Sequence, residues 1–133
     1  MSDYTRKNLK TDIDDMAPQF GMSPQMEARF AREALGCSKG GVSYERFAPG
    51  VRAPFGHTHK EQEEIYVVAS GSGRVRLDDE YLDVSQWDAI RVAGSTKRAF
   101  EAGPDGIELI AFGAPHVEGG DGELDFEWWP AES

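Results

Sequence analysis

The chain has 133 residues, with 14 lysines and arginines against 24 aspartates and glutamates, so its net charge is -10. This length suits one domain that buries its own core, and the acidic balance disfavours binding to the phosphates of nucleic acids. No apolar run of about twenty residues is present to cross a membrane. The single cysteine, Cys37, rules out an internal disulfide, and the N-terminus lacks an apolar leader. We therefore expect a cytoplasmic protein with no nucleic acid and no membrane partner.

The N-terminal part is predicted to be an arm followed by a helix. Residues 1–22 show no clear apolar periodicity and are expected to lie over the domain or over a neighbouring subunit. A typical helix start, apolar residues at helical spacing and a terminal glycine then follow: Ser23, Pro24, Met26, Phe30, Ala34 and Gly36. We expect residues 1–40 to form this arm and a short helix that packs on the rest of the domain.

From Gly41 the apolar pattern changes to a period of two, which is typical of strands. Strands are predicted over residues 42–47, 65–69, 74–77, 81–84, 89–92, 98–101 and 107–112. Turns are predicted at residues 78–80, 93–95 and 103–106, and a glycine turn after residue 69. Short strands at intervals of about ten residues indicate an all-β sandwich or barrel over residues 41–113, for which the double-sheet jelly roll is one solution.

The tail, residues 114–133, is glycine-rich and acidic before it becomes aromatic at Phe126, Trp128 and Trp129. Clustered large aromatics seldom stay in solvent, so we expect this part of the domain to close one end of the barrel or to dock on a second subunit. The long apolar strands and this tail together predict a homodimer.

Two of the three histidines, His57 and His59, are spaced i, i+2 and are followed by Glu64. On an extended chain such a spacing places both imidazoles on one face, where they project into the same cavity. A carboxylate on the next strand completes a facial set of two histidines and one acid, which hard and borderline divalent metals favour. The sequence therefore predicts a metal site at His57, His59 and Glu64.

The stretch reads Gly50, six residues, His57-Thr58-His59, four residues, Glu64, six residues, Gly71. This pattern resembles the first conserved motif of the cupin superfamily, and Glu64 fits it better than Glu63 because only Glu64 leaves six residues before the glycine. The resemblance implies a small single-domain cupin with a double-stranded β-helix, a jelly-roll barrel. It also implies a divalent ion, Zn, Fe, Mn or Ni, as the cofactor.

The second cupin motif is degenerate. Aligned on Trp87, every marked residue of that motif is replaced, and the histidine that would be the fourth ligand becomes Arg98; a shifted register would put Lys97 there. An arginine offers no lone pair and is not a ligand. It would instead pair with Glu64 and compete with a metal ion for that carboxylate. Gln62 and His116 are conceivable fourth groups.

A buried arginine fork also suits an anionic ligand, so Arg98 is a candidate anion anchor. Aromatic walls and a polar neighbour would complete such a pocket: Tyr66, Phe100, Phe47, Phe55 and Gln62. Three functions follow from these residues. The chain is a metal-dependent isomerase, dioxygenase or lyase acting on a sugar or organic acid, a non-catalytic cupin that binds an anionic small molecule, or a structural dimer with a vestigial site. We favour a divalent-metal site in the barrel and leave enzymatic activity open.

Overall fold

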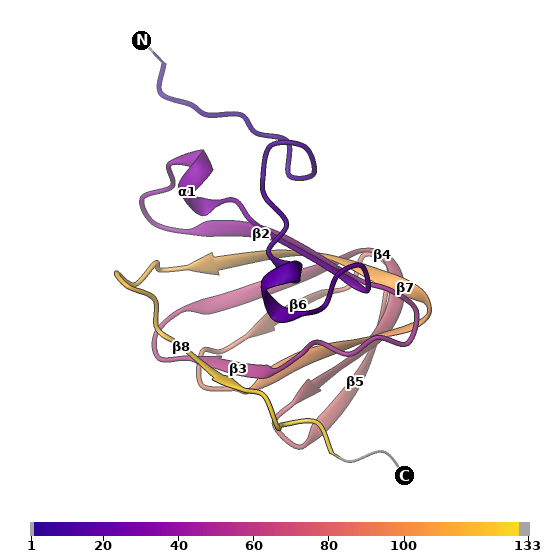
Figure 1. Ribbon diagram of the computed structural model, residues 1–133. Coiled ribbons are helices and arrows are strands. Elements are labelled where there is room, and N and C mark those ends of the chain that lie inside the picture. The colour runs from indigo at the N-terminus through magenta and orange to yellow at the C-terminus, as the bar shows by residue number, and fades with distance from the viewer. Residues whose placement is uncertain (1, 131–133) are drawn as a thin grey trace.

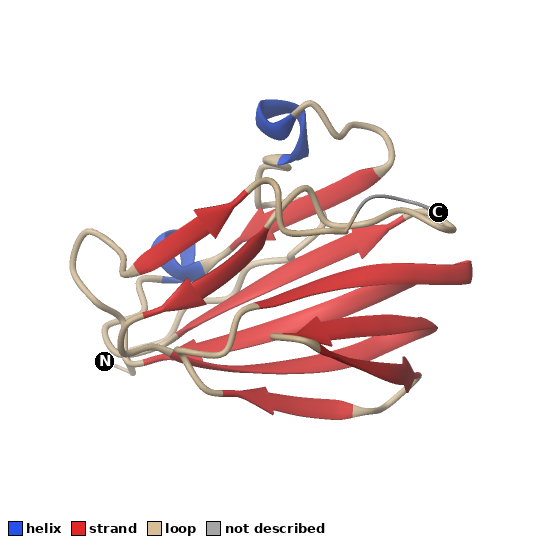
Figure 2. Ribbon diagram, turned by 90° about the horizontal axis from the view of Figure 1, so that it is seen from below, coloured by secondary structure: helices blue, strands red, loops and turns tan. Residues whose placement is uncertain are grey.

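The computed structural model of the chain describes residues 2–130. These residues form an all-β jelly roll in which antiparallel strands curl into a barrel-like sheet, with two short helical segments (Figures 1 and 2). The strands are β1 (Met26–Phe30), β2 (Gly41–Phe47), β3 (Gly56–His59), β4 (Glu63–Leu77), β5 (Glu80–Ser85), β6 (Ala89–Val92), β7 (Arg98–Ala114) and β8 (Gly122–Asp125). The helical segments are η1 (Ala17–Phe20) and α1 (Arg32–Leu35). The predicted all-β jelly roll with a short N-terminal helical segment is confirmed.

The antiparallel pair β4 and β7 is the centre of the fold. Tyr66 of β4 pairs with Ala111 of β7, and Val68 pairs with Leu109; all four side chains are buried. β2 adds to the other edge of β7. Because side chains alternate along a strand, one face of β2, β7 and β4 builds the core and the wall of the interior, while the other face points outward.

The turns predicted after residue 69 and at residues 103–106 are wrong. β4 and β7 each continue through these segments as one long strand. Gly71 pairs with Ile107 whereas Gly73 pairs with Ala102, so residues 103–106 bulge out of the ladder without reversing the chain. A Cβ on Gly71 or Gly73 would collide with a backbone carbonyl of β7, and glycine permits that close approach. The bulge lets the paired strands bend around the core.

The helix predicted after Ser23-Pro24 is also wrong. Met26–Phe30 form strand β1, antiparallel to β2, and Met26 pairs with Phe47. Met26 and Ala28 are buried while Phe30 is 53% exposed, so the pattern that the tertiary structure uses has a period of two. The free edge of β2 supplies backbone hydrogen-bond partners that outweigh the local helical spacing. Of the predicted helix, only the last turn is helical, as α1, and Gly36 ends it as expected, in the left-handed region.

The aromatic tail packs on the barrel of its own chain. β8 pairs with β3, and the ring of Trp128 lies against Gly56, where a Cβ would collide with it. The indole nitrogen of Trp129 donates a hydrogen bond to the carbonyl of Ala53 at 2.9 Å. Thus both ends of the described chain extend the same sheet. Within residues 2–130 no helix is long and apolar enough to span a membrane.

Candidate metal centre

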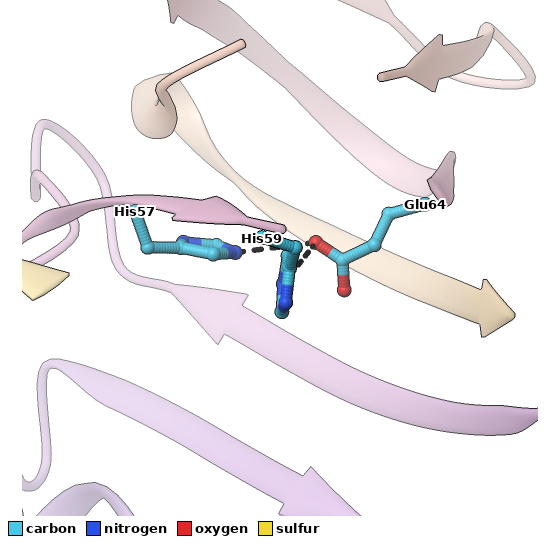
Figure 3. Close-up of side chains that lie close together, drawn as sticks. All are labelled: His57, His59 and Glu64. Carbon is cyan, nitrogen blue, oxygen red and sulfur yellow. Dashed lines mark hydrogen bonds and ion pairs between the residues drawn. The ribbon is translucent and has the colours of Figure 1, made fainter. Parts of the chain in front are cut away.

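The side chains of His57, His59 and Glu64 point toward one another and lie close together (Figure 3). β3 is extended, so the two imidazoles lie on the same face, with their ring centroids 5.1 Å apart. Nε2 of His57 lies 3.2 Å and Nε2 of His59 lies 3.3 Å from Oε1 of Glu64, the second residue of β4. The structure thus brings together the three residues that the sequence predicted as metal ligands.

These distances fit a shared metal ion. Two donor atoms that bind one ion through bonds of about 2.1 Å lie about 3.0 Å apart at right angles and about 3.4 Å apart at the tetrahedral angle. Both nitrogen-to-oxygen distances fall in that interval. The donors are two imidazoles and a carboxylate, a set that suits zinc or a redox-active first-row metal. The donor types and the two nitrogen-to-oxygen distances are therefore compatible with one ion.

Asp121, which the sequence analysis did not identify, contacts Nδ1 of His59, the ring nitrogen that does not face Glu64. Its Oδ1 lies 2.8 Å from Nδ1 of His59, and its Oδ2 accepts hydrogen bonds from the backbone N–H groups of Glu61 and Gln62. Burial alone would raise the pKa of Asp121, but these hydrogen bonds lower it well below its usual value. An ionised Asp121 favours the proton on Nδ1 of His59, so that Nε2 keeps its lone pair for the site.

Arg98 faces the interior, in the preferred register, while Lys97 forms an ion pair with Asp125. The Arg98 side chain has no exposed surface. Its Nη2 lies 3.1 Å from Oε1 of Glu64, and its Nε donates to the hydroxyl of Tyr66. Nη1 donates to two backbone carbonyls, those of residues 94 and 96. Arg98 therefore links the Glu64 carboxylate to the backbone of the cavity wall.

The charges of the site follow from these contacts. Burial tends to raise the pKa of Glu64, but hydrogen bonds with His57, His59 and Tyr66 outweigh it and hold the pKa far below its usual value. Burial lowers the pKa of His57. It also acts to lower that of His59, but hydrogen bonds to Glu64 and Asp121 prevail and raise it. Glu64 is therefore a carboxylate at neutral pH.

A cavity of about 410 Å³ lies in front of the three residues. Nearly all the residues considered for the site line it: His57, His59, Gln62, Glu64, Tyr66, Arg98, Phe100, Phe47 and Phe55. The exception is His116, considered as a fourth group, which does not line it; Cys37 does not line it either.

Two charged residues that the sequence analysis passed over also line the cavity, Glu45 on β2 and Arg32 on α1. The parity of β2 was available, since Glu45 shares its face with Phe47, whereas no local signal marks Arg32. Burial, together with repulsion from Glu64, raises the pKa of Glu45 to about 7.

The sequence matches no protein-family model and no curated protein. Several solved structures are similar to it. One is described as a cupin protein from Bacteroides fragilis; it is 25% identical, the match covers 86% of each chain, and the TM-score is 0.70. KdgF from a Halomonas species is 18% identical over 90% of this chain and 97% of its own, with a TM-score of 0.66. An RmlC-like cupin protein from Desulfovibrio desulfuricans is 17% identical over 86% of this chain and 100% of its own, with a TM-score of 0.64.

Proposed function

Because the chain belongs to the cupin superfamily, we propose that it holds a divalent metal ion through His57, His59 and Glu64 and acts as a metal-dependent enzyme on a small organic molecule. Zinc, iron, manganese and nickel all suit this donor set. The observation that carries the proposal is the position of both Nε2 atoms, 3.2 and 3.3 Å from the same carboxylate oxygen. With only three protein ligands, positions remain open for the organic molecule or water.

The surrounding residues prepare the three donors. The depressed pKa of His57 keeps that ring neutral, and Asp121 orients His59 by holding its Nδ1. The hydroxyl of Tyr66 donates to Oε1 of Glu64 at 2.6 Å, which fixes the carboxylate against the wall. A divalent ion bound here would polarise an oxygen of the organic molecule or acidify a bound water. Part of the cavity wall around it is apolar.

A second candidate function is non-catalytic binding of a small molecule. The ion pair between Arg98 and Glu64 favours it, because Arg98 already balances the carboxylate in the absence of a metal ion. A metal ion would also be repelled by the guanidinium at short range. The two candidates share the cavity and differ in whether the three donors carry an ion.

Elemental analysis of protein purified without a metal-chelating tag distinguishes them. We expect a first-row divalent ion in the wild type and its loss in the double variant His57→Ala/His59→Ala. The matched control is His116→Ala, which removes the third histidine, outside the cavity, and should retain the metal. Binding should weaken as the pH falls through the raised pKa of His59, because a protonated imidazole has no lone pair for a metal.

Two results would contradict the metal site. One is a metal content that the double variant leaves unchanged. The other is a wild-type protein that takes up none of the four metals when they are supplied, which would favour the non-catalytic candidate.

A further inference from the structure

Arg32 lines the same cavity as the three metal-binding candidates. It is the first residue of α1, and its aliphatic stem runs over Gly41, the first residue of β2. A Cβ built on Gly41 would lie 3.0, 3.3 and 3.4 Å from Cβ, Cγ and Cδ of Arg32. Glycine at position 41 therefore leaves the space in which this stem is seated.

The register of the sheet places Arg32 near the level of Glu64. Gly41 of β2 pairs with Gly113 of β7, and Gly113 pairs with Glu64 of β4. Neighbouring strands are about 4.8 Å apart, so Gly41 and Glu64 lie two strand spacings apart in one row. The residue between them is Gly113, and the side chain of Gln62 lies against it, where a Cβ would collide.

The guanidinium of Arg32 lacks a partner within the part of the chain that the structure describes. Its Nε is buried without a hydrogen-bond partner. A buried donor that is left unsatisfied is costly, and a charged one more so. Arg32 lines the cavity, where a carboxylate would match the fork of its guanidinium in two parallel hydrogen bonds.

Arg98 is less suited to that role. Its Nη2 also forms no hydrogen bond, but Arg98 has no exposed surface, pairs with Glu64 and donates to Tyr66 and two backbone carbonyls. A ligand would reach it only if neighbouring side chains moved. Arg32 lines the same cavity and is only partly buried, so it can meet a ligand as the structure stands.

The residues that line the cavity wall indicate the chemistry of the rest of the ligand. Five phenylalanines line it, Phe20, Phe30, Phe47, Phe55 and Phe100. A sugar carries hydroxyl groups around its ring, and hydroxyls buried against such a wall lose their hydrogen bonds to water without replacement. An aromatic or aliphatic body gains from the same contact.

We propose that Arg32 is the anion anchor of this cavity and that the ligand is a monocarboxylic acid with an apolar, ring-sized body. Its carboxylate pairs with Arg32, and its body lies on the phenylalanine wall. A further oxygen atom of the ligand, outside its carboxylate, reaches the site formed by His57, His59 and Glu64. Only this last contact rests on the proposed function, the binding of a metal ion by these three residues.

The test compares two probes of equal shape, phenylacetate and its neutral analogue phenylacetamide, by isothermal titration calorimetry. We expect wild-type protein to bind phenylacetate about tenfold more tightly than the amide, a difference of about 1.4 kcal/mol. Arg32→Met keeps an unbranched apolar stem over Gly41 and should abolish the preference, while Arg32→Lys should retain part of it. The matched control is Arg91→Met, which removes an exposed arginine that pairs with Glu63 outside the cavity.

The same titrations are run in the His57→Ala/His59→Ala background. Because the anchor is independent of the metal donors, the preference for phenylacetate should persist there even if the metal assignment fails. The proposal is overturned if wild-type protein binds both probes equally or binds neither at millimolar concentration. It is also overturned if folded Arg32→Met keeps the preference, or if D-glucuronate binds more tightly than phenylacetate.

Discussion

Arg98 stands where the resemblance to the second cupin motif places a histidine, and its guanidinium contacts the carboxylate that a metal ion would share. It is the largest side chain with no exposed surface among the described residues. At the scale of the residue, this substitution exchanges a neutral ligand for a fixed positive charge. The pair with Glu64 lets the barrel keep a buried carboxylate whether or not a metal is bound.

Glu45 supplies a pH-dependent test at the same scale. Burial and the nearby Glu64 raise its pKa to about 7, above the usual value of 4.5. Between pH 4.5 and about 7, Glu45 keeps its proton in the folded state and loses it in the unfolded state. The free energy of unfolding therefore falls as the pH rises through this range. We expect Glu45→Gln to stabilise the metal-free protein by up to about 3 kcal/mol near pH 8 and to have little effect near pH 4.

Urea unfolding at the two pH values measures this difference. Glu80→Gln, an exposed acid on β5, is the control and should change stability little at either pH. A Glu45→Gln protein that is no more stable than wild type at the higher pH would show that Glu45 is ionised without cost in the fold.

At the scale of the element, the segment before β8 acts on the metal centre. Asp121 directly precedes β8 and bonds both to His59 at the end of β3 and to the backbone between β3 and β4. The chain beyond the barrel core is therefore part of the site. Farther along the tail, the ring of Trp128 also packs on β3, against Gly56.

We expect Asp121→Asn to weaken metal binding about tenfold or more, because the amide no longer favours the required tautomer of His59. Glu123→Gln, two residues along on exposed β8, is the matched control and should bind metal as the wild type does. Competition with a chromogenic chelator measures both affinities. Equal affinities of the two variants would mean that Asp121 serves only to close the loop.

At the scale of the whole molecule, the outward face of the sheet predicts assembly. Phe112 and Ile65 pair across β7 and β4 and are 46% and 39% exposed, and Val42 on β2 pairs with Phe112 from the other side. Adjacent exposed apolar residues on a sheet are typical of an interaction surface. This row supports the homodimer that the sequence analysis predicted.

Light scattering at micromolar concentration should give about twice the chain mass of 14.7 kDa. Phe112→Glu should shift the mass to that of a monomer, since it places a charge in the row. Trp87→Glu alters a 72% exposed aromatic in the turn between β5 and β6 and should leave the dimer intact. A monomeric wild type would refute the assembly.

The sequence by itself determined the strand-rich class and the three converging donors. Alternation along β2 and β6 is local, and the spacing of His57, His59 and Glu64 acts through the geometry of one extended segment and its neighbour. The parity that turns Arg98 inward was readable for the same reason. Such features depend on a few residues that are close in the chain.

Only the tertiary structure decided the rest. Met26–Phe30 became β1 because the edge of β2, a distant segment, offered backbone partners, and residues 103–106 became a bulge because β4 pairs with β7 on both sides of it. Asp121 and Arg32 reach the site across the barrel from positions 62 and 27 residues away from His59. Contacts between segments so far apart carry no local periodicity, so nothing short of the folded sheet places them.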